Sequence, residues 1–284
     1  MTEYRDVNVT RILNPTSIDL GEYVINPYKG CEFSCLYCYV RSNKTAGREK
    51  RAWGSYVDAR VNAPSSLEKE LVLKNPACVL LGSTTECFQP IEAEKCISAN
   101  ILEILNAHKV YYVILTRSPY ISRVKSLLEK GFCKKIYFMV NNMPLDLKAR
   151  LEPNSPNFEA RSKVINELLD SGIDVVPYFS PVLPWITDLG DVFSRFPGSK
   201  SIEFEGLNFN LSNIKDVIEA VSSACPGLRD SYEQMLTDNK FYDRAWECIR
   251  KKIVSEAINS KKSYNVHIHR FGGYFENKYK KAMV

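Results

Sequence analysis

Three cysteines lie within eight residues of the stretch GCEFSCLYCYV, and their spacing is the strongest chemical signal in the chain. Cys31, Cys35 and Cys38 are separated by three and then by two residues. A structural zinc site normally has four ligands, but the sequence has no second CxxC and its three histidines lie far along the chain. A redox-active CxxC pair would have no use for Cys31. Three thiolates suit a four-iron cluster in which one iron keeps an open position for a small molecule.

The rest of the composition indicates a globular intracellular protein. Apolar residues make up 45% of the 284 residues and charged residues 25%. The N-terminus has no apolar stretch of the signal-peptide type, and no apolar run approaches the ~20 residues that span a bilayer. We therefore expect a cytoplasmic location and no membrane partner. In a reducing cytosol the six scattered cysteines are expected to be small, buried and inert: Cys78, Cys87, Cys96, Cys133, Cys225 and Cys248.

Apolar runs of strand length alternate with helical patterns along most of the chain. Strands are predicted at 77–82, 110–116, 135–141, from 173 onward and at 201–209, and helices at 65–74, 91–108, 119–130, 159–171 and 212–223. This alternation predicts an α/β protein with a parallel sheet. Periodicity does not distinguish a complete or partial barrel from an open sheet. In each of these forms, ligands bind at the carboxyl ends of the strands.

The cysteine motif resembles the signature of the radical S-adenosylmethionine (radical SAM) superfamily. The spacing CxxxCxΦC, with Tyr37 at the aromatic position, follows a first strand directly. The resemblance implies a single [4Fe-4S] cluster on Cys31, Cys35 and Cys38, with S-adenosylmethionine as the second cofactor. It also implies an enzyme that cleaves this cofactor to methionine and a 5′-deoxyadenosyl radical, which abstracts hydrogen from a substrate. A low-potential donor such as flavodoxin or ferredoxin is the implied partner.

Four further segments resemble the spore photoproduct lyase-like group, also described as DNA repair photolyase-like. They are NPYKGCEFSCLYCYVR, GSTTECFQPIE, VILTRSP and LEPNSPNFEARSKVINELLDSGIDVVPYFSPVLP. The resemblance covers roughly residues 20–190. With it we predict a partial (β/α)6 TIM-type barrel and a C-terminal helical and hairpin extension. The predicted boundaries are 1–20 for an N-terminal extension, 21–227 for the catalytic core and 228–284 for the C-terminal extension.

The resemblance assigns cofactor contacts to residues at strand ends. Thr85 and Glu86 match a pair that approaches the amino group of S-adenosylmethionine, and Arg117 stands where the group usually has a lysine on the carboxylate. Asn141 matches a polar position near the ribose or the methionine moiety. Val182, with its neighbour Pro181, would lie against the adenine, although a role in the core is equally compatible with its type.

Two other positions are not expected to contact the cofactor: Met139 differs from the residue usual in the group, and Arg161 is expected on the helix surface. Met139 stands where relatives tend to have serine, which removes one polar contact. Arg161 begins a helix, and we expect it on a solvated face.

Reversal of a thymine dimer is not the expected reaction. In the lyase, a cysteine just ahead of the polar-acidic pair returns hydrogen to the substrate, and Ser83 occupies that place here. A hydroxyl is a far poorer hydrogen-atom donor than a thiol. Cys87, four residues on, is the candidate substitute, and Tyr39 matches a tyrosine of the lyase relay.

The basic excess is concentrated in the C-terminal segment. Residues 240–284 carry 11 Lys/Arg and four Asp/Glu, a net charge of +7 in a chain of net +5. Aromatic residues are interleaved with these charges, a composition that binds nucleic acid through phosphates and stacking. The alternative is a solvated helix whose aromatic residues face the core.

Three functions therefore remain open at this stage. They are a radical SAM enzyme acting on nucleic acid or a nucleotide, a radical SAM maturase acting on a peptide or small metabolite, and a non-catalytic metal-binding protein.

Overall fold

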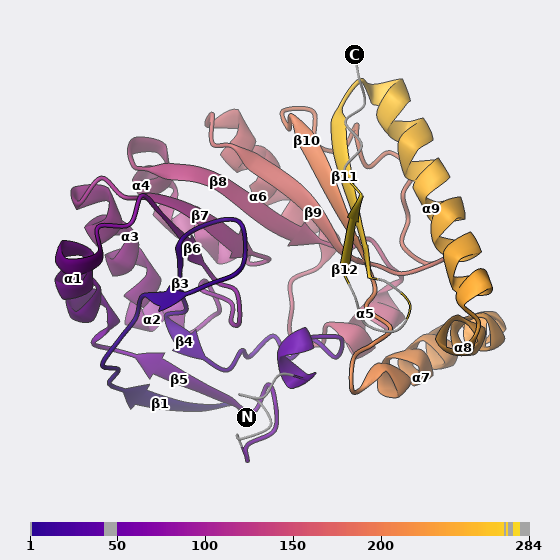
Figure 1. Ribbon diagram of the computed structural model, residues 1–284, viewed down its shortest axis with the longest axis horizontal. Helices are drawn as coiled ribbons and strands as arrows, with labels where there is room; N and C mark the ends of the chain where they lie inside the picture. The colour runs from indigo at the N-terminus through magenta and orange to yellow at the C-terminus, as the bar shows by residue number, and fades with distance from the viewer. Residues whose placement is uncertain (1, 43–49, 270, 272–274, 279–284) are drawn as a thin grey trace. The chain divides into compact units, whose positions relative to one another are not determined.

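The computed structural model describes residues 2–42, 50–269, 271 and 275–278 (Figure 1). The chain divides into two compact units. The first comprises Met1–Ser34, Glu49–Phe138 and Lys163–Val175, and the second comprises Cys35–Arg48, Met139–Ser162 and Val176–Val284. Within the described residues, no helix combines the length and apolar character needed to cross a bilayer.

The first unit is built on a mostly parallel sheet. Its strand order is β8-β7-β6-β3-β2, in which only β2 runs antiparallel to its neighbour. The bounds are Asn14–Pro15 for β2, Tyr23–Ile25 for β3, Cys78–Leu81 for β6, Tyr111–Thr116 for β7 and Cys133–Val140 for β8. A second sheet has the order β1-β5-β4, with β1 at Glu3–Val7, β4 at Tyr28–Lys29 and β5 at Tyr56–Arg60. The strands predicted at 77–82, 110–116 and 135–141 are confirmed.

The helices differ from the predicted ranges by one or two residues at their ends, and two of the predicted helices, 91–108 and 119–130, are each divided into two elements. The bounds are Ala63–Lys74 for α1, Glu92–Lys95 for α2, Ile97–Ala107 for α3, Pro119–Val124 for the 3₁₀ helix η3, Lys125–Lys130 for α4 and Phe158–Asp170 for α6. The helix α1 starts two residues earlier than predicted, after Asn62, and Pro64 suits its first turn. The predicted helix 91–108 is two helices, since Cys96 takes a left-handed conformation (φ +51°) that ends α2.

The second unit contains a parallel sheet of β9, β10 and β11, with β12 antiparallel at the end. The strand bounds are Val175–Val182, Ser201–Gly206, Ser263–His269 and Phe275–Lys278. The helices are η1 at Tyr39–Ser42, α5 at Leu145–Leu151, α7 at Ile214–Ala224, η4 at Pro226–Leu228, α8 at Arg229–Thr237 and α9 at Asn239–Ser260. The predicted hairpin is confirmed by the antiparallel pairing of β11 with β12, and Gly272 and Gly273, the glycine pair that indicates a hairpin turn in the sequence, lie outside the described residues. Its first strand, β11, pairs in parallel with β10 and so extends the core sheet.

One face of this sheet packs against the long C-terminal helix. Ile202, Phe204 and Gly206 share a face of β10 and are all buried. A Cβ atom added to Gly206 would lie 2.6 Å from the ring of Trp246 on α9. A glycine at this point therefore allows the helix to approach the strand closely.

The opposite face of β10 carries carboxylates that are paired with imidazoles of β11. Glu203 Oε2 lies 3.0 Å from Nε2 of His267, and Glu205 Oε1 lies 3.3 Å from Nε2 of His269. Glu205 also accepts a hydrogen bond of 2.7 Å from the hydroxyl of Ser180 on β9. Glu205, His269 and Ser180 stand near the carboxyl ends of three parallel strands, which is where α/β folds bind ligands.

Replacing Gly206 with alanine should destabilise the protein by about 1–3 kcal/mol, because the new methyl group overpacks the contact with Trp246. The substitution W246F removes the distal ring atoms, so the double variant G206A/W246F should lose less stability than the sum of the two single variants. Chemical denaturation of all four proteins measures this coupling. Additive losses would show that the helix does not approach the strand through Gly206.

The free energy of unfolding should depend on Glu205 in the acid range. Burial raises the pKa of Glu205, but hydrogen bonds from His269 and Ser180 outweigh it, and the net pKa lies below the ordinary value. A lowered pKa stabilises the folded state above the unfolded-state pKa, and this contribution is lost as pH falls through the folded-state pKa. The stability difference between wild type and E205Q should therefore shrink on acidification. Exposed Glu68, changed to Gln, serves as the control, and a pH-independent difference for E205Q contradicts the expectation.

Candidate active site

In the first unit, the loop that follows β6 holds the turn that carries Cys31. Gly30 has φ +89°, and an added Cβ atom would lie 2.3 Å from the carbonyl oxygen of Tyr56, so only glycine fits. The hydroxyl of Thr85 donates a 2.5 Å hydrogen bond to the Gly30 carbonyl. The side-chain oxygen of Gln89 accepts a 3.0 Å hydrogen bond from the backbone N–H of the residue after Cys31. The GSTTECFQP loop thus positions the first cysteine.

Glu32 is a further anchor of this turn that the sequence reasoning missed. Its carboxylate is buried and accepts hydrogen bonds from the backbone N–H of Ile91 at 3.1 Å and from the hydroxyl of Tyr4 at 2.8 Å. Glu32 and Gln89 both lie inside the segments that carry the family resemblance, so their position in the sequence could have indicated a structural role. An acidic residue between two cysteines and an amide in a buried loop are candidates for holding the loops together.

Glu86 links the ends of β6 and β7. Its carboxylate accepts hydrogen bonds from the backbone N–H of Phe88 at 2.9 Å, from the hydroxyl of Thr116 at 2.7 Å and from the backbone N–H of Arg117 at 2.9 Å. Burial raises the pKa of Glu86, against the opposing effect of these donors. Glu86 and Thr85 therefore have positioning roles within the protein. Their contacts with the amino group of a ligand, and that of Arg117 with a carboxylate, stay predictions.

Cys87 is fully buried, and burial raises the pKa of its thiol well above the ordinary value. Its role as a hydrogen donor stays a prediction. Ser83, at the place of the lyase's donor cysteine, is partly exposed and accepts a hydrogen bond from Asn26 at 3.3 Å. The expectation that the scattered cysteines are buried is wrong for most of them. Cys96 and Cys248 are exposed, because the first caps a helix and the second lies on the outer side of α9, whereas Cys78, Cys133 and Cys225 are partly buried.

In the second unit, a polar environment surrounds Cys35. Its sulfur lies 3.6 Å from the hydroxyl of Ser155, and both residues are buried. The Nε of Arg41 donates a 2.9 Å hydrogen bond to the Cys35 carbonyl. The backbone N–H of Cys38 donates to the same carbonyl at 3.3 Å, which forms the tight turn between the two cysteines. Neither Cys35 nor Cys38 forms a disulfide, and Cys38 is partly exposed.

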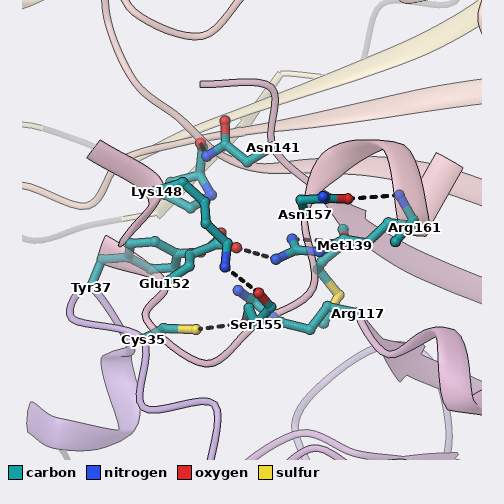
Figure 2. A network of polar contacts seen from close by, with 12 residues as sticks. Cys35, Tyr37, Arg117, Met139, Asn141, Lys148, Glu152, Ser155, Asn157 and Arg161 are labelled. Carbon is teal, nitrogen blue, oxygen red and sulfur yellow. Dashed lines mark hydrogen bonds and ion pairs between the residues drawn. The ribbon is translucent and has the colours of Figure 1, made fainter. Parts of the chain in front are cut away.

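Tyr37 is fixed by a buried carboxylate (Figure 2). Its hydroxyl donates to Glu152, and the guanidinium of Arg161 donates to the other oxygen of the same carboxylate. Arg161 is only 1% exposed, so the prediction of a solvated helix face is wrong. Its burial follows from this ion pair, since an unpaired buried carboxylate would cost several kcal/mol. The predicted aromatic position therefore belongs to a structural network.

Asn141 and Val182 lie at the carboxyl ends of β8 and β9. The amide of Asn141 donates a 2.5 Å hydrogen bond to the carbonyl of Pro181, and its oxygen accepts one of 3.2 Å from Thr187. Val182 is 2% exposed and belongs to the core of its unit. The contacts of both residues with ribose or adenine stay predictions.

Tyr39 lies close to the polar face of the second unit's sheet. Its side chain is about half exposed, yet burial, with the nearby charges of Cys38 and Glu205, raises the pKa of its hydroxyl to about 12. The phenol therefore keeps its proton across the physiological range. Its role in a hydrogen-atom relay stays a prediction.

The donor set fits an iron–sulfur cluster by its chemistry. None of the three motif cysteines forms a disulfide, so their thiols can act as ligands, and Cys35 has a hydroxyl beside its sulfur. Cys31 belongs to the first unit, whereas Cys35 and Cys38 belong to the second. No three Cys, His, Asp or Glu side chains among the described residues are grouped closely enough to hold a metal ion. The assignment of the cluster ligands therefore rests on the sequence spacing and on the family.

Curated relatives share most of the chain. The sequence is 27% identical over 264 residues to the uncharacterized protein MJ0683 of Methanocaldococcus jannaschii, which covers 92% of this chain and 94% of the relative. It is 24% identical over 188 residues to the uncharacterized protein Mb2609c of Mycobacterium bovis, covering 62% of this chain and 54% of that protein.

Solved structures of spore photoproduct lyase share the fold. One variant superimposes with a TM-score of 0.64 at 15% identity, covering 93% of this chain and 81% of the lyase chain. The lyase complexed with dinucleoside spore photoproduct gives a TM-score of 0.57 at 15% identity, and the match covers 78% of this chain and just under two thirds, 66%, of that one. These matches confirm the predicted α/β fold of the partial TIM-type barrel kind.

The family model of the radical SAM superfamily matches residues 25–189, more than half of the chain, and this range includes all three cysteines of the motif. The chain therefore belongs to the radical SAM superfamily.

Proposed function

We propose that the protein binds one [4Fe-4S] cluster through Cys31, Cys35 and Cys38 and is a radical SAM enzyme of the spore photoproduct lyase-like kind. When bound, the cluster would supply the electron that cleaves S-adenosylmethionine to methionine and a 5′-deoxyadenosyl radical, which abstracts hydrogen from a substrate. The observation that carries the proposal is the three-thiol motif inside the matched family region. A flavodoxin- or ferredoxin-like donor is the proposed reducing partner.

The protein's own contribution is to position loops and exclude water. Thr85 fixes the carbonyl next to Cys31, and Glu86 fixes the ends of two neighbouring strands. Glu152 anchors Tyr37, so the aromatic ring of the motif cannot rotate away. Buried groups that are already hydrogen-bonded need no reorganisation when a ligand arrives, which is the condition for a preorganised site.

The first candidate substrate is a nucleic acid or nucleotide bound through the basic C-terminal segment. The lyase of similar fold binds a dinucleoside photoproduct. Arg244 lies 6.0 Å from the ring centre of Phe241, and Phe271 is 40% exposed, so part of the segment offers rings and cations to solvent. Tyr242 and Trp246, in contrast, are buried in the core, as the alternative interpretation of these aromatic residues expected.

The second candidate substrate is a peptide or small metabolite. Two carboxylates, Glu203 and Glu205, stand on one face of β10, where they contact the imidazoles of His267 and His269 and the hydroxyl of Ser180. Carboxylates attract amines and other hydrogen-bond donors and repel phosphates. The preference of this face for a donor-rich group over a phosphate supports the maturase hypothesis.

Removing one cluster ligand should abolish the chemistry. Wild-type protein reconstituted anaerobically with iron and sulfide, then reduced with dithionite in the presence of S-adenosylmethionine, should yield 5′-deoxyadenosine. C35A should lose both iron and 5′-deoxyadenosine formation. C248A removes an exposed thiol outside the motif and should behave as wild type. Chromatography of the products and iron analysis are the measurements, and a C35A protein with unchanged iron and turnover would refute the proposal.

If the C-terminal segment binds nucleic acid, reversing two exposed lysines of α9 should weaken that binding. The variant K251E/K252E should bind a single-stranded oligonucleotide less tightly, and the slope of log K against log salt should fall by roughly 1.4, at about 0.7 per phosphate contact. Exposed Lys69 of the first unit, changed to Glu, is the control. Equal affinity and slope in all proteins would leave the peptide or metabolite class as the proposal.

A further inference from the structure

The loop between α5 and α6 places Ser155 beside Cys35, one of the proposed cluster ligands. This loop, EPNSPN, lies in one of the segments that carry the family resemblance, and the resemblance assigns no role to its residues. Ser155 lies in it, is 3% exposed and places its hydroxyl 3.6 Å from the sulfur of Cys35 (Figure 2). Cys35 itself is 6% exposed, so water has little access to this contact.

Iron ligation would decide the direction of this hydrogen bond. In the free protein either the thiol or the hydroxyl can be the donor. A cysteine that ligates iron is a thiolate without a proton, so only the hydroxyl of Ser155 could then donate.

The surrounding contacts keep Ser155 in place. The ammonium group of Lys148 donates to the carbonyl of Ser155, and the backbone N–H of Ser155 donates to the carbonyl of Glu152 at 3.3 Å. Glu152 is in turn held by Tyr37, two residues beyond Cys35, and by Arg161. The same network therefore holds both Ser155, the proposed donor, and the Cys35–Tyr37 segment, which carries the acceptor sulfur.

We propose that Ser155 is a positioning residue that donates a hydrogen bond to the Cys35 sulfur of the bound cluster and thereby raises the reduction potential of that cluster. The inference rests on the proposed function. Reduction adds one electron from the donor protein, the [4Fe-4S]²⁺ core becomes [4Fe-4S]⁺, and Ser155 keeps its proton. The added negative charge is partly on the sulfurs, so a donor to a sulfur stabilises the reduced state more than the oxidised state. Burial strengthens this effect, because little water screens it.

The reduction potential of the reconstituted protein tests the proposal directly. Potentiometric titration followed by electron paramagnetic resonance should show a more negative midpoint potential for S155A than for wild type. S155T and S155V have the same shape and differ in the hydroxyl, so S155T should have a potential close to wild type and S155V one close to S155A. The control is S162A, since Ser162 is a buried serine whose hydroxyl has no hydrogen-bond partner in the described structure. Its potential should equal that of wild type.

A second measurement covers the case in which S155A binds iron poorly. Electron–nuclear double resonance in D₂O should detect an exchangeable proton coupled to the cluster in wild type and S155T that is missing in S155V. Equal potentials and equal exchangeable couplings in S155T and S155V would overturn the proposal. Wild-type protein that forms no cluster and no 5′-deoxyadenosine would refute the proposed function itself, whereas a functional cluster insensitive to the hydroxyl at position 155 would refute this inference alone.

Discussion

Buried carboxylates that hold loops together are the constraint on which the candidate functional residues of each unit depend. Glu86 joins the ends of two strands in the first unit, and Glu152 joins Tyr37 to Arg161 in the second. Removing a carboxylate from water costs several kcal/mol, and only a full set of donors offsets this cost. Each carboxylate therefore requires its partners in fixed positions, and this requirement restricts the movement of the loops that carry those partners.

This arrangement gives a structural role to residues that the family resemblance assigns to ligand binding. Thr85, Glu86 and Asn141 were expected to face a ligand, and each is already hydrogen-bonded to the protein. A polar group with such partners orients backbone carbonyls and amides that a ligand can then meet. Within each unit, the structure thus assigns these side chains a supporting role that sequence comparison does not reveal.

The polar face of the second unit's sheet adds a feature that the family pattern does not include. Glu205, with His269 and Ser180, lies at the carboxyl ends of three parallel strands, and Tyr39 is close enough for Glu205 to contribute to its raised pKa. Tyr39, the residue that follows the last cysteine of the motif, is thereby electrostatically coupled to the carboxylate of Glu205.

The sequence by itself determined the alternation of strands and helices and the three-cysteine motif, because both are local patterns with fixed periods. Only the tertiary structure decided the burial of Arg161, the break at Cys96 and the parallel pairing of β11 with β10. The burial of Arg161 depends on the carboxylate of Glu152, nine residues away, and the pairing of β11 with β10 joins strands separated by more than fifty residues. Such outcomes follow from partners brought together by folding, and no local pattern encodes them.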